Sequence, residues 1–185
     1  MTARPFRRLV RRASWRRFFA TAALFAFYAG WFAAGDSPLT RARSTAGRLP
    51  ELTPGFPPGE PAATLSRLGA ARGDYLWAQA FDAVFVALAA MTALFALALA
   101  ARTSAAHTAL RALTLVPIAY AAAELFENFL LALFAFGALA PAPTLASLQQ
   151  AATTAKFGFF ALTLVLSFSF IAGLGDPASK GRSLA

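Results

Sequence analysis

Four long apolar segments constrain what this chain can fold into: residues 18–34, 75–101, 110–139 and 156–174. The first of them contains no charged residue. A helix needs about 20 predominantly apolar residues to cross the hydrocarbon core of a bilayer, with about 17 as the lower limit. The segments therefore predict an all-α fold, an integral membrane four-helix bundle.

The composition supports this prediction. Charged residues make up 14% of the 185 residues and hydrophobic residues 58%, whereas about a quarter of the residues in a typical soluble domain are charged. The chain has no cysteine, which excludes disulfides, thiolate metal sites and cysteine nucleophiles. A single histidine, His107, argues against an ordinary zinc or iron site. We predict neither a metal nor a cofactor.

An arginine-rich arm precedes the first apolar segment. Its seven arginines are Arg4, Arg7, Arg8, Arg11, Arg12, Arg16 and Arg17. A basic segment directly before a transmembrane helix indicates the cytoplasmic side and contact with anionic lipids, and this reading is favoured over nucleic acid as the partner. Lys and Arg are also more numerous in the connections expected on this side. The distribution predicts a bacterial inner-membrane protein with both termini in the cytoplasm.

These signals divide the chain into a basic cytoplasmic arm (1–17), a membrane domain (18–174) and a cytoplasmic tail (175–185). The outer loop, residues 35–74, contains the sequence PAATLSRL (residues 61–68), which predicts a short helix at the bilayer surface. A competing interpretation is a signal peptide cleaved near residues 33–35, which the later apolar segments disfavour.

Two further features concern the later segments. Pro117 is expected to kink the third transmembrane helix, because proline lacks the backbone N–H that a helix interior uses. Residues 144–155 are polar and are expected to form a helical turn before the fourth helix begins at Lys156.

Polar side chains interrupt the second and third segments at helical spacing. Tyr75, Gln79 and Asp82 stand at i, i+4 and i+7, so they share one face of a helix. The third segment repeats this arrangement in the stretch YAAAELFEN, residues 120–128. Ionisable groups inside a bilayer are costly and usually face the interior of a bundle. We therefore expect the two faces to meet.

Lys156 opens the fourth segment on the same side of the membrane and is the expected cationic partner of Asp82 or Glu127. The predicted polar cluster comprises eight residues: Tyr75, Gln79, Asp82, Tyr120, Glu124, Glu127, Asn128 and Lys156.

Short motifs accompany these residues after position 50. They are Gly55-Phe56, Leu68-Gly69, Arg72-Gly73-Asp74-Tyr75, Asp82, Glu124-x-x-Glu127-Asn128 and Thr154-Ala155-Lys156. Their order resembles an uncharacterised family of small bacterial four-span membrane proteins, in which helix two carries an Asp, helix three an Asp-x-x-Glu-Asn motif, and a Lys opens helix four. Glu124 stands where members usually have Asp. The resemblance implies the architecture and brings no known activity.

Two classes of function fit the sequence. We favour a binding or structural membrane component in which the carboxylates, amides and Lys156 form a buried network. The alternative is a small membrane enzyme or carrier, in which Asp82, Glu124 and Glu127 act on a lipophilic or cationic substrate. A divalent cation held by the same carboxylates is a weaker alternative. No catalytic residue is assigned, and the oligomeric state is left open.

Overall fold

The computed structural model describes residues 3–57, 59–103 and 107–174, and within these ranges the chain forms helices and no strands. Four described stretches are long and apolar enough to cross a membrane: Trp15–Ala46, Glu60–Arg102, Thr108–Phe136 and Pro143–Ser169. The all-α prediction is confirmed, and the four stretches are compatible with an integral membrane protein. The tail predicted at 175–185 lies outside the described residues.

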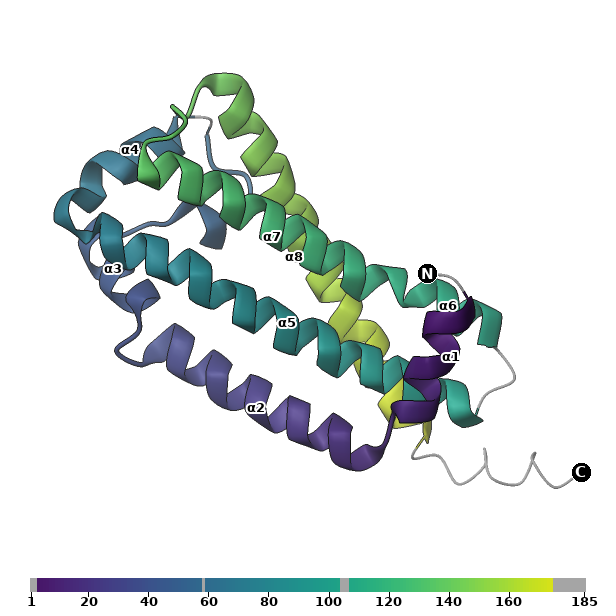
Figure 1. The fold of residues 1–185 in the computed structure, drawn as a ribbon. Helices are drawn as coiled ribbons and strands as arrows, with labels where there is room; N and C mark the ends of the chain where they lie inside the picture. Colours follow the sequence, from purple (N-terminus) through teal and green to yellow (C-terminus); the bar gives the residue numbers. More distant parts are fainter. Residues whose placement is uncertain (1–2, 58, 104–106, 175–185) are drawn as a thin grey trace, which may run out of the picture.

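The longest of the described helices run side by side along the molecule (Figure 1). They are α2 (Trp15–Ala34), α5 (Arg72–Thr103), α7 (Leu115–Phe136) and α8 (Pro143–Leu174). Helix α5 contacts each of the other three, and α7 also packs against α8. Helix α5 is therefore the centre of the bundle, and residues on α5, α7 and α8 can meet inside it.

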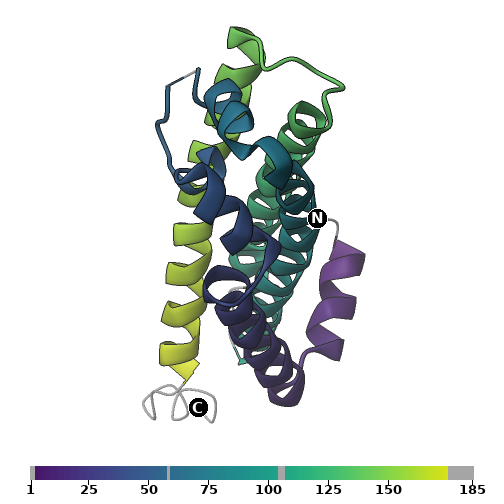
Figure 2. The ribbon, with the colours of Figure 1, turned by 90° about the vertical axis from the view of Figure 1, so that its left-hand side faces the viewer.

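Shorter helices gather at the two ends of the bundle (Figures 1 and 2). One end, called the loop end, is built from α3 (Pro38–Ala46), the 3₁₀ turn η1 (Pro50–Leu52), α4 (Glu60–Leu68) and the 3₁₀ turn η2 (Gly69–Ala71). The other, called the arginine end, is built from α1 (Ala3–Arg12) and α6 (His107–Leu113). The last turns of α8 lie at the arginine end as well (Figure 2).

The loop end contains a helix that the sequence analysis missed. Helix α3 begins with a capping box: the Ser37 hydroxyl accepts from the Thr40 N–H at 3.2 Å, and the Thr40 hydroxyl accepts from the Ser37 N–H at 3.0 Å. Pro38 fits the first helical position, where no N–H is needed. The cap is a local sequence signal, but the helix is short and polar, so no apolar periodicity distinguishes it from the surrounding loop.

Helix α4 matches the predicted short helix closely. Its apolar face does not lie free, because Leu68 is fully buried in a cluster with Phe32, Tyr75 and Leu131. The cluster ties α4 to the ends of α2, α5 and α7. A position at a bilayer surface stays a prediction.

Two helix boundaries differ from expectation. Helix α8 begins at Pro143, so residues 144–155 belong to it and a start at Lys156 is too late. The third segment is interrupted at Thr114, between α6 and α7, about one turn before Pro117, whose missing N–H would otherwise bond to the Leu113 carbonyl. Pro117 consequently lies in the first turn of α7, where its missing N–H removes no bond within that helix.

Candidate functional site

Lys156 lies between two carboxylates in the interior of the bundle. Its Nζ atom is 2.6 Å from Glu124 Oε1 and 2.6 Å from Glu127 Oε2. The two glutamates are three residues apart on α7, so they present adjacent carboxylates to α8. All three side chains are buried. The predicted pairing of Lys156 with Glu127 is found, but among the described residues Lys156 forms no ion pair with Asp82.

Glu127 is held by two further groups on α8. Gln149 Nε2 donates to Glu127 Oε1 at 2.8 Å, and the Thr153 hydroxyl donates to the same oxygen. Gln149, Thr153 and Lys156 stand at i, i+4 and i+7, so one face of α8 surrounds this carboxylate. Glu127 is completely buried, and its bonds are those that a buried carboxylate requires.

Asp82 and Asn128 form a second contact across α5 and α7. Asn128 Nδ2 donates to Asp82 Oδ2 at 2.7 Å. Asp82 is partly exposed, whereas Asn128 is buried. The residues that the structure describes make no other hydrogen bond to the Asp82 side chain. Asp82 is therefore less completely paired than either glutamate.

Tyr75 and Gln79 point to a residue that was not predicted. The Tyr75 hydroxyl donates to Glu51 Oε2 at 2.9 Å, and Gln79 Nε2 donates to Glu51 Oε1 at 3.1 Å. Glu51 belongs to η1, which folds back over the bundle, and it is only 5% exposed. Helices α5 and α7 thus meet at the site through Asp82 and Asn128, whereas Tyr75 and Gln79 of α5 bond to Glu51 at the loop end.

The surroundings of Glu51 make it easy to protonate. Burial raises the pKa of Glu51 to about 7 from its ordinary value of 4.5, and the negative charge of Glu127 acts in the same direction. A backbone hydrogen bond, the positive charge of Lys156 and the Tyr75 hydroxyl oppose this rise. Glu51 can therefore gain or lose a proton near neutral pH.

These groups surround a common space. A void of about 40 Å³ is bordered by six polar residues and four apolar ones. The polar residues are Glu51, Gln79, Asp82, Glu124, Asn128 and Lys156, and the apolar ones are Phe32, Leu39, Leu52 and Ala78. The void adjoins a larger cavity of about 200 Å³ between α2, α5, α7 and α8. The larger cavity is lined by Ala29, Phe32, Ala33, Leu39, Glu51, Leu52, Asp82, Phe85, Tyr120, Glu124, Lys156, Phe157 and Phe160. Its walls are mostly apolar. Its charged groups, Glu51, Asp82, Glu124 and Lys156, belong to the hydrogen-bonded network described above, which is called the polar site from here on.

Tyr120 contributes a wall rather than a polar contact. Its ring packs against Phe160 with centroids 5.2 Å apart, and no described residue forms a hydrogen bond with its hydroxyl. All eight residues of the predicted cluster therefore lie in or beside the site, although Tyr120 is not part of its hydrogen-bond network.

Three residues of the network were missed. Gln149 and Thr153 lie in the stretch predicted to be a polar helical turn before the fourth helix, but their spacing to Lys156 is that of one helical face. Glu51 had no such sign, because its place depends on how the Pro-rich loop folds. Periodic spacing shows which residues share a face of a helix, but it cannot show where a loop packs against that helix.

The charges decide what the site can do. Three carboxylates on the long helices, Asp82, Glu124 and Glu127, lie near one ammonium group, so the site favours a bound cation. The Lys156 ammonium already lies between the glutamates, where the alternative of a divalent cation would place the metal. Among the described residues, no three His, Cys, Asp or Glu side chains are placed to hold a metal ion.

Comparison with known proteins adds no further assignment. No family model matches the chain, and neither the curated proteins nor the solved structures contain a match.

Proposed function

We propose that this chain is a bacterial inner-membrane protein, with both termini in the cytoplasm, that binds an apolar molecule carrying a cationic or hydrogen-bond-donating end group. Membership of the four-span family that its motifs resemble is part of this proposal. The observation that carries it is the cavity of about 200 Å³ with apolar walls and with Asp82, Glu124 and Lys156 at its border.

The two kinds of wall have separate roles. Phe32, Phe85 and Phe160 offer apolar surface to the body of the ligand, which then moves from lipid into an environment of similar polarity. Asp82 offers a carboxylate that has one protein donor, so a donor or cation on the ligand supplies the missing partner. The pairs of Lys156 with Glu124 and Glu127 keep the neighbouring helices in register.

The test combines a cavity-filling variant with a matched control. Ala29→Phe places a ring in the cavity, whereas Ala26→Phe adds the same ring to an exposed position of α2 that does not line it. We expect lipophilic molecules that copurify with the wild type, identified by mass spectrometry of an organic extract, to be lost from Ala29→Phe and retained by Ala26→Phe.

Asp82→Asn tests the polar end of the same site. The variant keeps the volume and the bond geometry to Asn128 but removes the charge, and we expect it to retain less of a ligand that carries a cation. Folded yield and thermal unfolding in detergent accompany both measurements. Unchanged ligand content together with lowered stability in Asp82→Asn and Ala29→Phe would show that the network is structural alone.

A second candidate is a small membrane enzyme or carrier that moves a proton. The observation in its favour is Glu51, which lines the same cavity and has a pKa of about 7. In reconstituted vesicles, such a carrier would acidify or alkalinise the lumen only when its substrate is added, and Glu51→Gln would abolish that change. Substrate uptake that is equal in both proteins would eliminate Glu51 as the proton carrier.

A further inference from the structure

The arginine end of the bundle contains a second pocket, separate from the polar site. It has a volume of about 790 Å³ and lies between α1 and α6. The residues that line it are Arg4, Phe6, Arg7, Arg8, Val10, Arg11, Thr108 and Arg111. Five of these eight are arginines, and they come from two parts of the chain that are far apart in sequence.

None of the five arginines is neutralised within the described chain. The ion pairs of the described residues involve Arg41, Arg67 and Lys156, at the loop end and in the polar site. The described acidic residues also lie in those two regions. Like charges held close together repel, so this pocket is a favourable place for an anion.

The arginines are held in place by a folded helix. Phe6 of α1 is buried against Leu97 and Ala101 of α5 and against Leu110 of α6. The chain just after α1 is fixed as well, because Arg102 Nη1 donates to the Ala13 carbonyl at 2.8 Å. The arm is therefore an ordered wall, and ordering its guanidinium groups costs less when a ligand binds.

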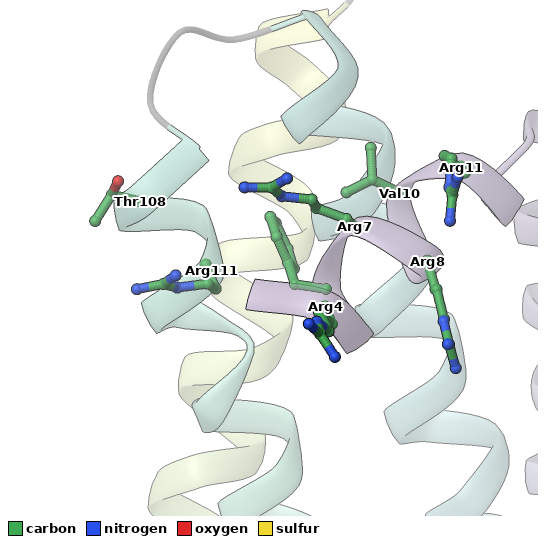
Figure 3. Close-up of a pocket in the computed structure, with 8 residues that line it drawn as sticks. Arg4, Arg7, Arg8, Val10, Arg11, Thr108 and Arg111 are labelled. Carbon is green, nitrogen blue, oxygen red and sulfur yellow. The ribbon is translucent and has the colours of Figure 1, made fainter. Parts of the chain in front are cut away.

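Figure 3 shows how the side chains are arranged around this pocket. Arg7 extends from α1 toward α6, which carries Thr108 and Arg111 (Figure 3). Arg8 points along the other side of α1 (Figure 3). Arg7 and Arg111 thus line the pocket from the two helices that border it, and Arg8 adds a third charge from α1.

We propose that this pocket binds the phosphate of an anionic phospholipid, and binds it best when the phosphate is a dianionic monoester. Guanidinium groups form paired hydrogen bonds with phosphate oxygens, and a terminal phosphate has three oxygens available to several arginines. Phe6 and Val10 add apolar surface beside the charges. This combination suits a headgroup joined to acyl chains better than a free anion, and the pocket lies at an end of the apolar bundle, where headgroups are found.

The test measures binding of short-chain lipids to the full-length protein in detergent. The probes are dioctanoyl phosphatidic acid, dioctanoyl phosphatidylglycerol and dioctanoyl phosphatidylcholine. We expect affinity to fall in that order. The double variant Arg7→Gln with Arg111→Gln should weaken phosphatidic acid binding by about tenfold or more, since each lost charge-assisted bond contributes on that scale.

The matched control removes two charges from the same arm outside this pocket. Arg12→Gln with Arg16→Gln should weaken binding by no more than about twofold, because neither residue lines the pocket. Equal loss in both double variants would overturn the site in favour of diffuse attraction. Arg7→Lys with Arg111→Lys keeps the charge without the planar fork, so an intermediate loss supports phosphate recognition even where the glutamine pair folds poorly.

Two further probes distinguish the class of ligand. Inorganic phosphate should compete with the lipid only at much higher concentration. Displacement at equal concentration would overturn the lipid assignment in favour of a soluble anion. A short single-stranded oligonucleotide that competes as well as phosphatidic acid would overturn it in favour of nucleic acid.

Discussion

At the residue scale, the polar site depends on unequal numbers of charges. Lys156 is 2.6 Å from each of two glutamates, and Asp82 adds a carboxylate at the border of the cavity. A buried ion pair is a weak source of stability, because desolvation opposes the attraction, but removing one partner leaves a charge without compensation. The individual residues therefore differ in what their loss should do.

Lys156→Met should be strongly destabilising. It leaves Glu124 and Glu127 buried without a cation, which typically costs about 3–5 kcal/mol. We expect a lower unfolding temperature and less monodisperse protein in detergent. Adding Glu124→Gln and Glu127→Gln to this variant removes the uncompensated charges and should restore part of the stability. A triple variant that is less stable than Lys156→Met would contradict this account.

Glu51 should make stability depend on pH. Its pKa is about 7 in the folded chain and 4.5 ordinarily, so the folded protein binds more protons between these values. Stability should fall as pH rises from about 4.5 to 7, by up to about 3 kcal/mol, and should show no further loss from Glu51 above that range. Thermal unfolding in detergent across this range measures the effect.

Glu51→Gln should flatten this part of the pH profile, because the amide does not titrate. Tyr75→Phe serves as the control, since it removes the hydroxyl that favours the charged carboxylate and keeps the carboxyl group. Its profile should keep the slope and extend it to higher pH. Identical slopes in wild type and Glu51→Gln would show that other groups cause the dependence.

At the element scale, α3 and α8 show why local signals differ in value. Helix α3 is short, and its place at the loop end depends on the cap that Ser37 provides to Thr40. Helix α8 is long, and its polar first turns share a face that closes around Glu127. A cap fixes where a helix starts, whereas a shared face fixes what the helix packs against.

Ser37→Ala should destabilise the loop end by about 1 kcal/mol, which is typical for loss of an N-cap. The Ser37 hydroxyl also donates to the Phe32 carbonyl at 2.6 Å, so α2 and α3 lose a connection as well. Ser44→Ala is the control on the same helix, since its hydroxyl bonds only to the Arg41 carbonyl and is exposed. Equal shifts in unfolding temperature would exclude a capping role.

The elements also show how much of the site could be foreseen. Apolar segment length predicted the long helices, and spacing by four and seven residues placed Asp82 and Glu127 on inward faces. Partner choice could not be predicted in the same way. The sequence offers Lys156 two candidate partners, Asp82 and Glu127, and the observed pairing with both Glu124 and Glu127 depends on how α8 packs on α7. Glu51 lay beyond any periodic signal, since it stands in a loop.

At the scale of the whole molecule, the two ends of the bundle have different chemistry. The loop end pairs its acidic and basic residues, as in the contact of Arg41 with Asp36 and Asp74. The arginines of α1 and α6 that line the pocket form no ion pair with any residue that the structure describes. Such asymmetry is the basis for the proposed orientation, with the arginine end in the cytoplasm.

The absence of cysteine makes this orientation simple to test. Ser44→Cys and Thr108→Cys introduce single thiols at exposed positions of opposite ends. In intact spheroplasts, a membrane-impermeant maleimide should label the first and spare the second, and both should react after lysis. The reverse pattern would show that the molecule is inserted the other way round.

The contact between Arg102 and the Ala13 carbonyl joins residues 89 positions apart. It therefore sets an order for assembly during synthesis. Helix α1 leaves the ribosome long before its binding surface on α5 and α6 exists, so α1 cannot reach its final place until well over half of the chain has been made. Docking of the arginine arm, and with it the completion of the pocket between α1 and α6, therefore follows the synthesis of α6.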